Sequence, residues 1–401
     1  MANIAVLGYG TIGAGVVKVL QGNAAVIEKR AKQKIQVKRI LDLRDFPGDP
    51  NADKITHDFK DIRQDAEIEV VVECMGGLMP AYPFVKSSLL EGKSVVTSNK
   101  ELVAKHGSEL IDIAASKGTN FLFGASVGGG IPIIRPILAC LSADVLGSIK
   151  GILNGTTNFI LTAMEERGWS FERALKKAQE LGYAERNPEA DVEGFDACRK
   201  IAILTSLALE RQVDFEDIYT EGITAITAED FRYAARLHRK IRLLGMSIME
   251  EGENHAMVSP FLIDETNPLA SVRDVFNAIL VHGNMSDDIM FYGKGAGSLP
   301  TASAVAADVI DCVRSRGRHK EIRWNPEKAV LSHDGSFSRR FFVRLEDSVD
   351  KDQIRQAFGQ VEYVVLDDLE EKAFVTGFMT EKDFKAAIKE TGRLINRIRL
   401  D

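Results

Sequence analysis

The chain has 401 residues, of which 45% are hydrophobic and 27% charged, and its formal net charge is −7. This balance is typical of a globular protein with two or three domains, and an acidic chain offers no field that attracts nucleic acid. No apolar stretch approaches the roughly 20 residues that span a membrane, no leader-like segment precedes the first strand, and the cysteines are scattered. We therefore expect a cytoplasmic protein without nucleic-acid or membrane partners.

The first third of the chain alternates short β-branched segments with longer amphipathic ones. Strands are predicted at Ile4–Leu7, Val37–Leu41, Glu69–Glu73, Lys93–Thr97 and Asn120–Phe123, and helices at segments such as Ile12–Leu20, Tyr82–Leu90 and Gly107–Lys117. This alternation predicts an α/β fold that begins with a Rossmann-type, doubly wound parallel sheet. We assign it to residues 1–133, with a later helix at about 299–324 returning to pack on it.

A glycine-rich segment, Gly8-Tyr9-Gly10-Thr11-Ile12-Gly13, joins the first strand to the first helix. Gly8 permits the tight turn, Gly10 lets the backbone approach a diphosphate, and Gly13 lets the helix pack on the strand. The helix N-terminus then offers N–H donors to the phosphates. A purely structural turn is the alternative, but a strand before and a helix after favour dinucleotide binding.

The end of the second strand carries two opposing signals for the choice of nucleotide. Asp42 could accept a hydrogen bond from a ribose 2′-hydroxyl, which indicates NAD, whereas Arg44 could hold a 2′-phosphate, which indicates NADP. The pattern predicts NAD(P) and leaves the preference open. Lys100 lies just past another strand of the sheet, at the edge where such sheets bind ligands, although an ordinary surface lysine is the alternative.

Residues 134–298 change in character and predict a mixed α+β domain for substrate binding, catalysis and dimerisation. Strands are predicted at Ser148–Asn154, His255–Ile263, Ala278–His282 and Asp288–Tyr292, and helices at Asn158–Arg167, Ser170–Leu181, Phe195–Glu210 and Ala228–Leu244. The apolar segments are more than one small domain needs. We therefore expect a homodimer or homotetramer.

An acidic loop in this domain leads into an almost wholly apolar helix. Glu185 and Asp191 lie in the loop, and Asp196 and Lys200 are four residues apart at the start of the helix. A capping aspartate with a local ion pair explains this spacing as well as a catalytic role does. Further on, the glycines of residues 293–297 indicate a close backbone approach, either to a cofactor or to a neighbouring loop.

The last part of the chain repeats the alternation on a smaller scale. Residues 325–339 are polar and turn-rich and are predicted to be a linker. Residues 340–401 then follow the order β-α-β-β-α-β of a ferredoxin-like module. Every candidate site residue precedes this module, so truncation before about Ser338 is expected to leave an active enzyme.

Six segments taken in order resemble homoserine dehydrogenase: Gly8–Gly13, Thr97–Lys100, Ala125–Pro132, Gly151–Asn158, Leu181–Lys200 and Gly295–Thr301. The tail resembles an ACT domain. The resemblance implies NAD(P)-dependent interconversion of L-homoserine and L-aspartate 4-semialdehyde, in the biosynthesis of threonine, methionine and isoleucine. The segments GILNGTTNFIL and Glu185–Lys200 are specific to this family, whereas GxGxxG is not.

The resemblance also assigns roles to single residues. It implies that Lys200 donates the proton in semialdehyde reduction and that Lys100 lies near both nicotinamide and substrate. Three acids would hold the substrate's amino group and support the lysines: Glu185, Asp191 and Asp196. The implied cofactor-binding residues are Gly8, Tyr9, Gly10, Thr11, Ile12, Gly13, Asp42, Arg44, Ser98, Lys100, Gly182 and Gly297.

Two positions depart from the family pattern. The family has a glutamate that serves a structural monovalent cation, Na⁺, where this chain has Gly124. The positions whose backbone carbonyls would complete that site remain, namely Val127, Gly129 and Ile131, but a hard cation binds less well without the carboxylate. In the tail, the loop Glu346–Lys351 lacks the glycine usual in effector-binding ACT modules.

Two other functions compete with this reading. A semialdehyde dehydrogenase would work through a cysteine thioester, for which Cys74 at a strand end is the candidate, although no histidine stands near it in sequence. A catalytically silent dinucleotide sensor would tolerate the loss of Lys100 or Lys200, and both are present.

Overall fold

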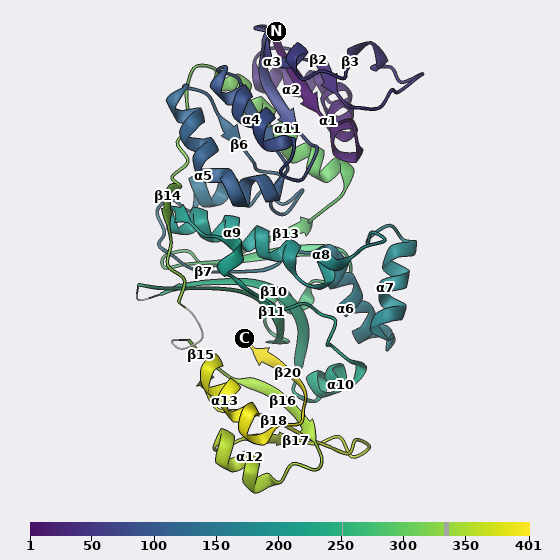
Figure 1. Ribbon diagram of the computed structural model, residues 1–401, viewed down its shortest axis with the longest axis vertical. Coiled ribbons are helices and arrows are strands. Elements are labelled where there is room, and N and C mark those ends of the chain that lie inside the picture. The colour runs from purple at the N-terminus through teal and green to yellow at the C-terminus, as the bar shows by residue number, and fades with distance from the viewer. Residues whose placement is uncertain (251, 333–336) are drawn as a thin grey trace. The chain divides into compact units, whose positions relative to one another are not determined.

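The computed structural model describes residues 1–250, 252–332 and 337–401, and it divides into two compact units (Figure 1). Unit 1 comprises residues 1–145, 202–215 and 291–329, and unit 2 comprises residues 146–201, 216–290 and 330–401. Among the described residues, no helix combines the length and the apolar character needed to cross a membrane.

Unit 1 is built on a parallel sheet in the order β3-β2-β1-β4-β5-β6. Strands β1 and β4 are almost continuously apolar and buried, as expected for central strands covered on both faces. The predicted doubly wound Rossmann sheet is therefore confirmed. The strands are β1 (Ala2–Leu7), β2 (Ile35–Leu41), β3 (Ile55–Thr56), β4 (Ile68–Glu73), β5 (Ser94–Thr97) and β6 (Phe121–Leu122).

The helices of unit 1 form two groups. α1, α2 and α11 pack together, with α11 also on β4 and β5, and α4 packs against α5, so helices flank both faces of the sheet (Figure 1). A short parallel pair, β8 and β14, completes the unit. The bounds are α1 (Thr11–Gly22), α2 (Ala24–Ala31), α3 (Lys60–Arg63), α4 (Ala81–Leu90), α5 (Lys100–Ser116), a π-helical turn (Pro136–Cys140), β8 (Arg211–Gln212), α11 (Ser298–Arg314) and β14 (Asn325–Lys328).

The second sheet runs in the order β13-β12-β7-β10-β11-β20-β16-β18-β17, and β9 also pairs with β11. Its central pair, β10 and β11, is antiparallel over twelve residues each and forms a buried core with β7 and β12. The strands are β7 (Leu146–Ile152), β9 (Tyr219–Thr220), β10 (Arg239–Glu250), β11 (Glu253–Asp264), β12 (Phe276–Gly283) and β13 (Asp287–Lys294).

The helices before β10 carry the acidic loop and the chain around it. They are α6 (Gly155–Arg167), α7 (Phe171–Glu180), α8 (Glu189–Val192), α9 (Phe195–Leu209), which continues into unit 1, and α10 (Ala228–Arg236).

The helix predicted over Ala228–Leu244 is wrong beyond Arg236, because the chain continues as β10. His238 adopts a left-handed φ of 56°, which ends the helix. Residues 241–248 are all buried, so this strand shows no alternation of apolar and polar residues. A continuous apolar run does not distinguish a buried strand from a buried helix.

The tail forms β16 (Phe341–Glu346), α12 (Lys351–Phe358), β17 (Glu362–Val364), β18 (Glu371–Val375), α13 (Glu381–Thr391) and β20 (Leu394–Leu400). The strand order β20-β16-β18-β17 is that of the predicted ferredoxin-like module. A short pair, β15 (Ser338–Arg339) and β19 (Met379–Thr380), flanks it. Of the stretch predicted as a linker, residues 333–336 lie outside the described residues.

The tail is also part of the second sheet, which the sequence does not predict. β20 pairs in parallel with β11 through Phe261 and Leu262. Arg399 on β20 is wholly buried and donates hydrogen bonds to Glu221 and Ser259 outside the tail. The βαββαβ module therefore shares a continuous hydrogen-bonded sheet with the rest of unit 2.

Candidate active site

The glycine-rich loop of unit 1 has the shape of a diphosphate cradle. Gly8 adopts φ +89°, and a Cβ on Gly13 would lie 1.9 Å from the carbonyl oxygen of Gly8, so neither position accepts a side chain. Nothing lies within 4 Å of a Cβ on Gly10, and this N-cap residue of α1 provides no side-chain cap to the helix. The space beside Gly10 at the start of α1 is therefore open, and the first N–H groups of the helix would bind phosphate oxygens there.

Asp42 is held in place at the end of β2. Its Oδ2 accepts a hydrogen bond from the backbone N–H of Tyr9 at 2.8 Å. The Arg44 guanidinium binds both carboxylate oxygens, with Nε at 2.9 Å and Nη2 at 3.0 Å. Hydrogen bonds from Arg44 are the main cause that lowers the pKa of Asp42 well below its usual range. Asp42 and Arg44, which indicate different nucleotides, therefore form one ion pair beside the loop.

Lys100 is the first residue of α5, and a chain of hydrogen bonds fixes this position. Asn99 caps the helix by accepting from the N–H of Leu102, and its Nδ2 donates to the carbonyl of Gly77. The Asn99 N–H donates to Thr97 Oγ1, which in turn donates to Glu73. These hydrogen bonds do not assign a chemical role to Lys100, but they hold it at the carboxyl end of the parallel sheet.

Glu73 organises the loop after β4. The side chain is fully buried, and it accepts hydrogen bonds from the N–H groups of Met75 and Gly76 as well as from Thr97. Burial raises the pKa of Glu73 and outweighs these hydrogen bonds. From the sequence, Glu73 is predicted only as the last residue of a strand.

The glycines of residues 293–297 pack against a neighbouring loop. A Cβ on Gly129 would lie 2.5 Å from the carbonyl oxygen of Gly295, and the N–H of Gly130 donates to the carbonyl of Lys294. Ser298 Oγ donates to the carbonyl of Thr11 at 2.7 Å, which brings the start of α11 to the start of α1. Gly297 has φ +120° and begins α11 at this point, beside the cradle.

In unit 2, Lys200 lies in a buried polar cluster. Its Nζ donates to Asp196 Oδ2 at 2.6 Å and to the carbonyl oxygen of Leu153 at 2.7 Å. Asp196 and Lys200 are 5% and 9% exposed. A buried ion pair with additional hydrogen bonds is far more constrained than a surface pair, so the ammonium is held in one orientation.

Asn154 connects the acids of this cluster. Its Nδ2 donates to Asp191 Oδ1 at 2.7 Å and to Asp196 Oδ2 at 2.9 Å, while its Oδ1 caps α6 by accepting from the N–H of Thr157. The structure thus brings Asp191, Asp196 and Lys200 together. Asn154 is not among the residues predicted for the site, although it lies inside the segment Gly151–Asn158 and has the residue type of an N-cap.

Glu185 and Gly182 are not part of these contacts. The Glu185 residue is exposed, and its backbone carbonyl accepts a hydrogen bond from Gln179. Gly182 adopts φ +73° after α7, with nothing within 4 Å of a Cβ, so the left-handed conformation accounts for this glycine. Their roles toward substrate and cofactor stay predictions.

The residues around Gly124 fit a monovalent cation poorly. A Cβ on Gly124 would lie 2.9 Å from Asp308 Oδ2, and this carboxylate accepts from the N–H of Gly124 and from Arg135 Nη2 at 2.6 Å. Of the carbonyls expected as ligands, that of Ile131 already accepts from the N–H of Ile133 at 2.9 Å. The Asp308–Arg135 pair fills the space that a glutamate at 124 would need.

Cys74 lacks the surroundings of a catalytic thiolate. Burial is the main cause that raises the pKa of its thiol well above the usual range, and Glu73 raises it further. A nucleophilic cysteine needs the opposite shift. The thioester chemistry considered from the sequence therefore has no support at this position.

Two family models match successive parts of the chain. The family described as "Homoserine dehydrogenase, NAD binding domain" matches residues 8–124, and the family described as "Homoserine dehydrogenase" matches residues 132–310. The chain is 42% identical over 321 residues to the homoserine dehydrogenase of Pseudomonas aeruginosa, covering 80% of this chain and 74% of that protein.

Two solved structures extend the comparison. The structure of a homoserine dehydrogenase from Thiobacillus denitrificans matches with a TM-score of 0.92 and 36% identity, over 100% of this chain and 98% of that one. A hyperthermophilic archaeal homoserine dehydrogenase in complex with NADPH matches with a TM-score of 0.65 and 25% identity, over 78% of this chain and 97% of that one.

Proposed function

The chain belongs to the homoserine dehydrogenase family, and on that premise we propose how its own residues carry out the reaction. The enzyme uses NAD(P) to interconvert L-homoserine and L-aspartate 4-semialdehyde. The family expected from the sequence motifs is thereby confirmed, and so is the nicotinamide cofactor.

The observation that carries the proposed mechanism is the buried Lys200–Asp196 pair. Lys200 donates a proton to the oxygen of the semialdehyde as that oxygen develops negative charge, and it takes the proton back in the oxidation of homoserine. Asp196 and the Leu153 carbonyl each accept a hydrogen bond from the ammonium, which holds Lys200 in a defined orientation. Lys200 also stabilises the oxyanion electrostatically, because its charge is in place before reaction.

The cofactor is assigned to unit 1. When bound, the reduced nicotinamide would supply a hydride to the aldehyde carbon. Gly8–Gly13 and the start of α1 would hold the diphosphate, Asp42 and Arg44 the adenosine ribose, and Ser98, Lys100 and Gly297 the nicotinamide end. Gly182 is assigned to the nicotinamide end from the family resemblance alone.

The substrate's amino group needs carboxylates. We assign this role to Glu185 and Asp191. We assign Asp196 to positioning Lys200, because its Oδ2 accepts hydrogen bonds from Lys200 and Asn154. We also assign Lys100 to the substrate, to which it would offer a second positive charge. These roles follow the resemblance residue by residue.

We further propose a homodimer or homotetramer and an ACT-like character for residues 340–401. Large apolar side chains remain exposed in unit 2, among them Leu181, Tyr183, Phe195, Met285 and Met290. We propose that some of these side chains are covered by a second subunit. Light scattering of the purified protein measures the subunit number directly.

One assay tests the proposed chemistry. Purified enzyme with aspartate semialdehyde should oxidise NADPH or NADH, and the product should be homoserine by chromatography. Formation of an acyl product that requires phosphate would instead indicate a semialdehyde dehydrogenase, and cofactor binding without turnover would indicate a sensor. A Cys74→Ala variant should retain activity, because Cys74 takes no part in the mechanism.

A further inference from the structure

Glu221, which directly follows β9, is held by two arginines of the tail. Arg397 Nη1 donates to both of its carboxylate oxygens, at 3.0 and 2.8 Å, and Arg399 Nη1 donates to Oε2 at 2.8 Å. Burial raises the pKa of Glu221, but the charges and hydrogen bonds of Arg399 and Arg397 outweigh it and lower the pKa below its usual value. The carboxylate is therefore ionised at neutral pH and binds both arginines.

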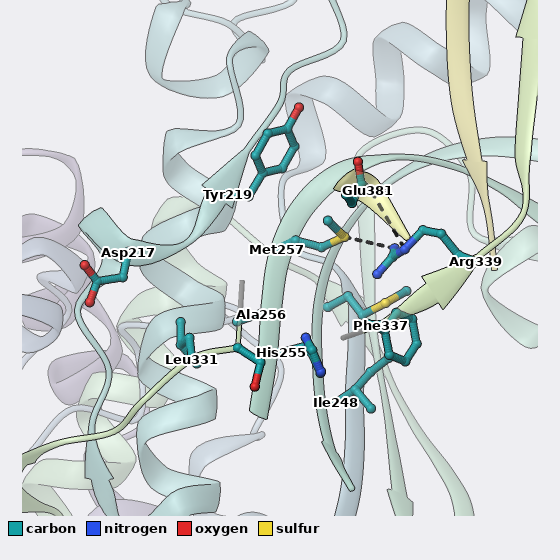
Figure 2. A pocket seen from close by; sticks show the side chains of 12 residues that line it. Asp217, Tyr219, Ile248, His255, Ala256, Met257, Leu331, Phe337, Arg339 and Glu381 are labelled. Carbon is teal, nitrogen blue, oxygen red and sulfur yellow. Dashed lines mark hydrogen bonds and ion pairs between the residues drawn. The ribbon is translucent and has the colours of Figure 1, made fainter. Parts of the chain in front are cut away.

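Further contacts fix the two arginines. Arg399 is buried, and its Nε and Nη2 donate to Glu381 at the start of α13. Arg397 Nη2 donates to the hydroxyl of Tyr219, which in turn donates to Glu221 Oε2. Figure 2 shows Tyr219 and Glu381, both of which line a small pocket. The position of Glu221 thus depends on residues that lie 176 and 178 positions further along the chain.

The two residues after Glu221 pack directly on α8. A Cβ on Gly222 would lie 2.1 Å from the carbonyl oxygen of Val192, so this position accepts no side chain. The N–H of Ile223 donates to the same carbonyl at 2.8 Å. The backbone that follows Glu221 is therefore in contact with the backbone next to Asp191.

Gly194 makes a second contact between the two segments. It adopts φ +85°, and a Cβ at this position would lie 3.2 Å from the Thr220 side chain and 3.4 Å from the carbonyl oxygen of Glu221. The N–H of Gly194 donates to the carbonyl of Asp191 at 3.0 Å. Closely packed segments transmit displacement, so a shift of the chain at Glu221 would move the turn that carries Asp191.

We propose that Glu221 is a positioning residue for the substrate site. The tail arginines hold Glu221, and the chain at Glu221 holds the turn formed by residues 189–194. Asp191 accepts a hydrogen bond from Asn154 at 2.7 Å and lies on this turn, so a displaced turn would aim its carboxylate away from the substrate's amino group. The effect on turnover rests on the proposed function of Asp191, whereas the ordering of the turn does not.

The test is Glu221→Gln, which keeps the shape of the side chain and removes its charge. We expect KM for aspartate semialdehyde to rise at least about 5-fold, with KM for NADPH unchanged, because the substrate's ammonium loses part of a charge-assisted hydrogen bond. Hydrogen exchange followed by mass spectrometry should show faster exchange of the backbone amides of residues 189–196, since the turn opens more often.

Glu371→Gln is the matched control, because it removes a carboxylate that Arg344 binds with two N–H groups elsewhere in the tail. It should lower Tm and leave both KM for the semialdehyde and the exchange of residues 189–196 unchanged. If Glu221→Gln fails to fold, Arg397→Gln removes one of the two arginines and should cause smaller changes of the same kind. Arg397→Lys keeps the charge and should reverse part of them.

Asp191→Asn separates this inference from the proposed function. Faster exchange in Glu221→Gln, with KM unchanged there and in Asp191→Asn, would support the positioning of the turn and remove Asp191 from substrate binding. A raised KM in Asp191→Asn but not in Glu221→Gln would overturn the positioning role. So would a Glu221→Gln protein with a lower Tm and wild-type exchange at residues 189–196, because Glu221 would then only stabilise the fold.

Discussion

Among single side chains, Lys200 is the one on which the proposed chemistry depends most. We expect Lys200→Ala to lower kcat by at least about 100-fold, the lower end of what a general acid contributes, with cofactor affinity unchanged. Steady-state rates with aspartate semialdehyde and a fluorescence titration with NADPH measure the two quantities. Lys177→Ala is the matched control, since this lysine has a half-exposed side chain and its ion pair in the described contacts is with Glu180. A variant that keeps a tenth of the wild-type kcat would remove Lys200 from the mechanism.

Gly124 leads to a prediction about ions. Asp308 and Arg135 occupy the space beside it, and the Ile131 carbonyl is already an acceptor. We expect kcat/KM to change less than about 2-fold when Na⁺ is replaced by K⁺ or by a bulky organic cation at constant ionic strength, because cation binding needs more oxygen ligands than remain. Strong, saturable activation by one of these ions would contradict this interpretation.

At the level of secondary structure, the end of β2 carries one ion pair that we propose sets the nucleotide preference. Arg44 neutralises Asp42, and without it the ionised carboxylate would repel a 2′-phosphate. We expect Arg44→Ala to lower kcat/KM for NADPH by about 10-fold, the loss of one charge-assisted contact, and to change the value for NADH much less. Equal losses with both nucleotides would show that Arg44 only stabilises the fold.

The start of α6 links a helix cap to catalysis, because Asn154 both caps the helix and donates to Asp191 and Asp196. Asn154→Ala should destabilise the protein by about 0.5–2 kcal/mol, the range for a lost N-cap, and should also lower kcat. Asn154→Ser restores a capping oxygen without the two amide hydrogen bonds. We therefore expect Asn154→Ser to recover Tm but not kcat. Recovery of both Tm and kcat would show that Asn154 acts only as the helix cap.

The elements that were predictable from the sequence are those whose pattern is local. The strand–helix alternation and the GxGxxG segment identify the Rossmann sheet, because each element carries its own periodicity and turn signals. β10 lacks such a signal, since residues 241–248 are buried on both faces, and its first half, residues 239–244, is predicted as helix. In the site, the spacing of Asp196 and Lys200 was visible, but Asn154 and Glu73 depend on contacts with residues far away along the chain.

The molecule as a whole differs from the sequence expectation most clearly at the tail. The sequence predicts that truncation before about Ser338 leaves an active enzyme, whereas the packing favours the opposite outcome. Arg344 on β16 and Asn396 on β20 both donate hydrogen bonds to Asp230, which is 0% exposed, and Glu221 is held by Arg397 and Arg399. No local pattern in the sequence predicts these pairings.

We therefore expect residues 1–337 expressed alone to aggregate or to unfold at a much lower temperature than the full chain. Removing one partner of a buried ion pair costs about 3–5 kcal/mol, and the truncation does so at more than one site. Soluble yield, thermal unfolding and light scattering of the two proteins provide the comparison. Arg355→Ala, on the exposed side of α12, should leave the full-length protein unchanged. A soluble truncated protein with wild-type Tm would show that the tail is an independent module.

The parallel pairing of β11 with β20 also bears on how the protein is made. A ribosome releases the chain from its N-terminus, so β11 leaves the exit tunnel well before the strand that lies beside it in the finished sheet. Until residue 400 has emerged, β11 keeps an open edge on that side, and open edges recruit other strands. Unit 2 is thus expected to complete its fold only after residue 400 has emerged. During that interval a growing chain on a crowded polysome would benefit from a chaperone that shields this edge.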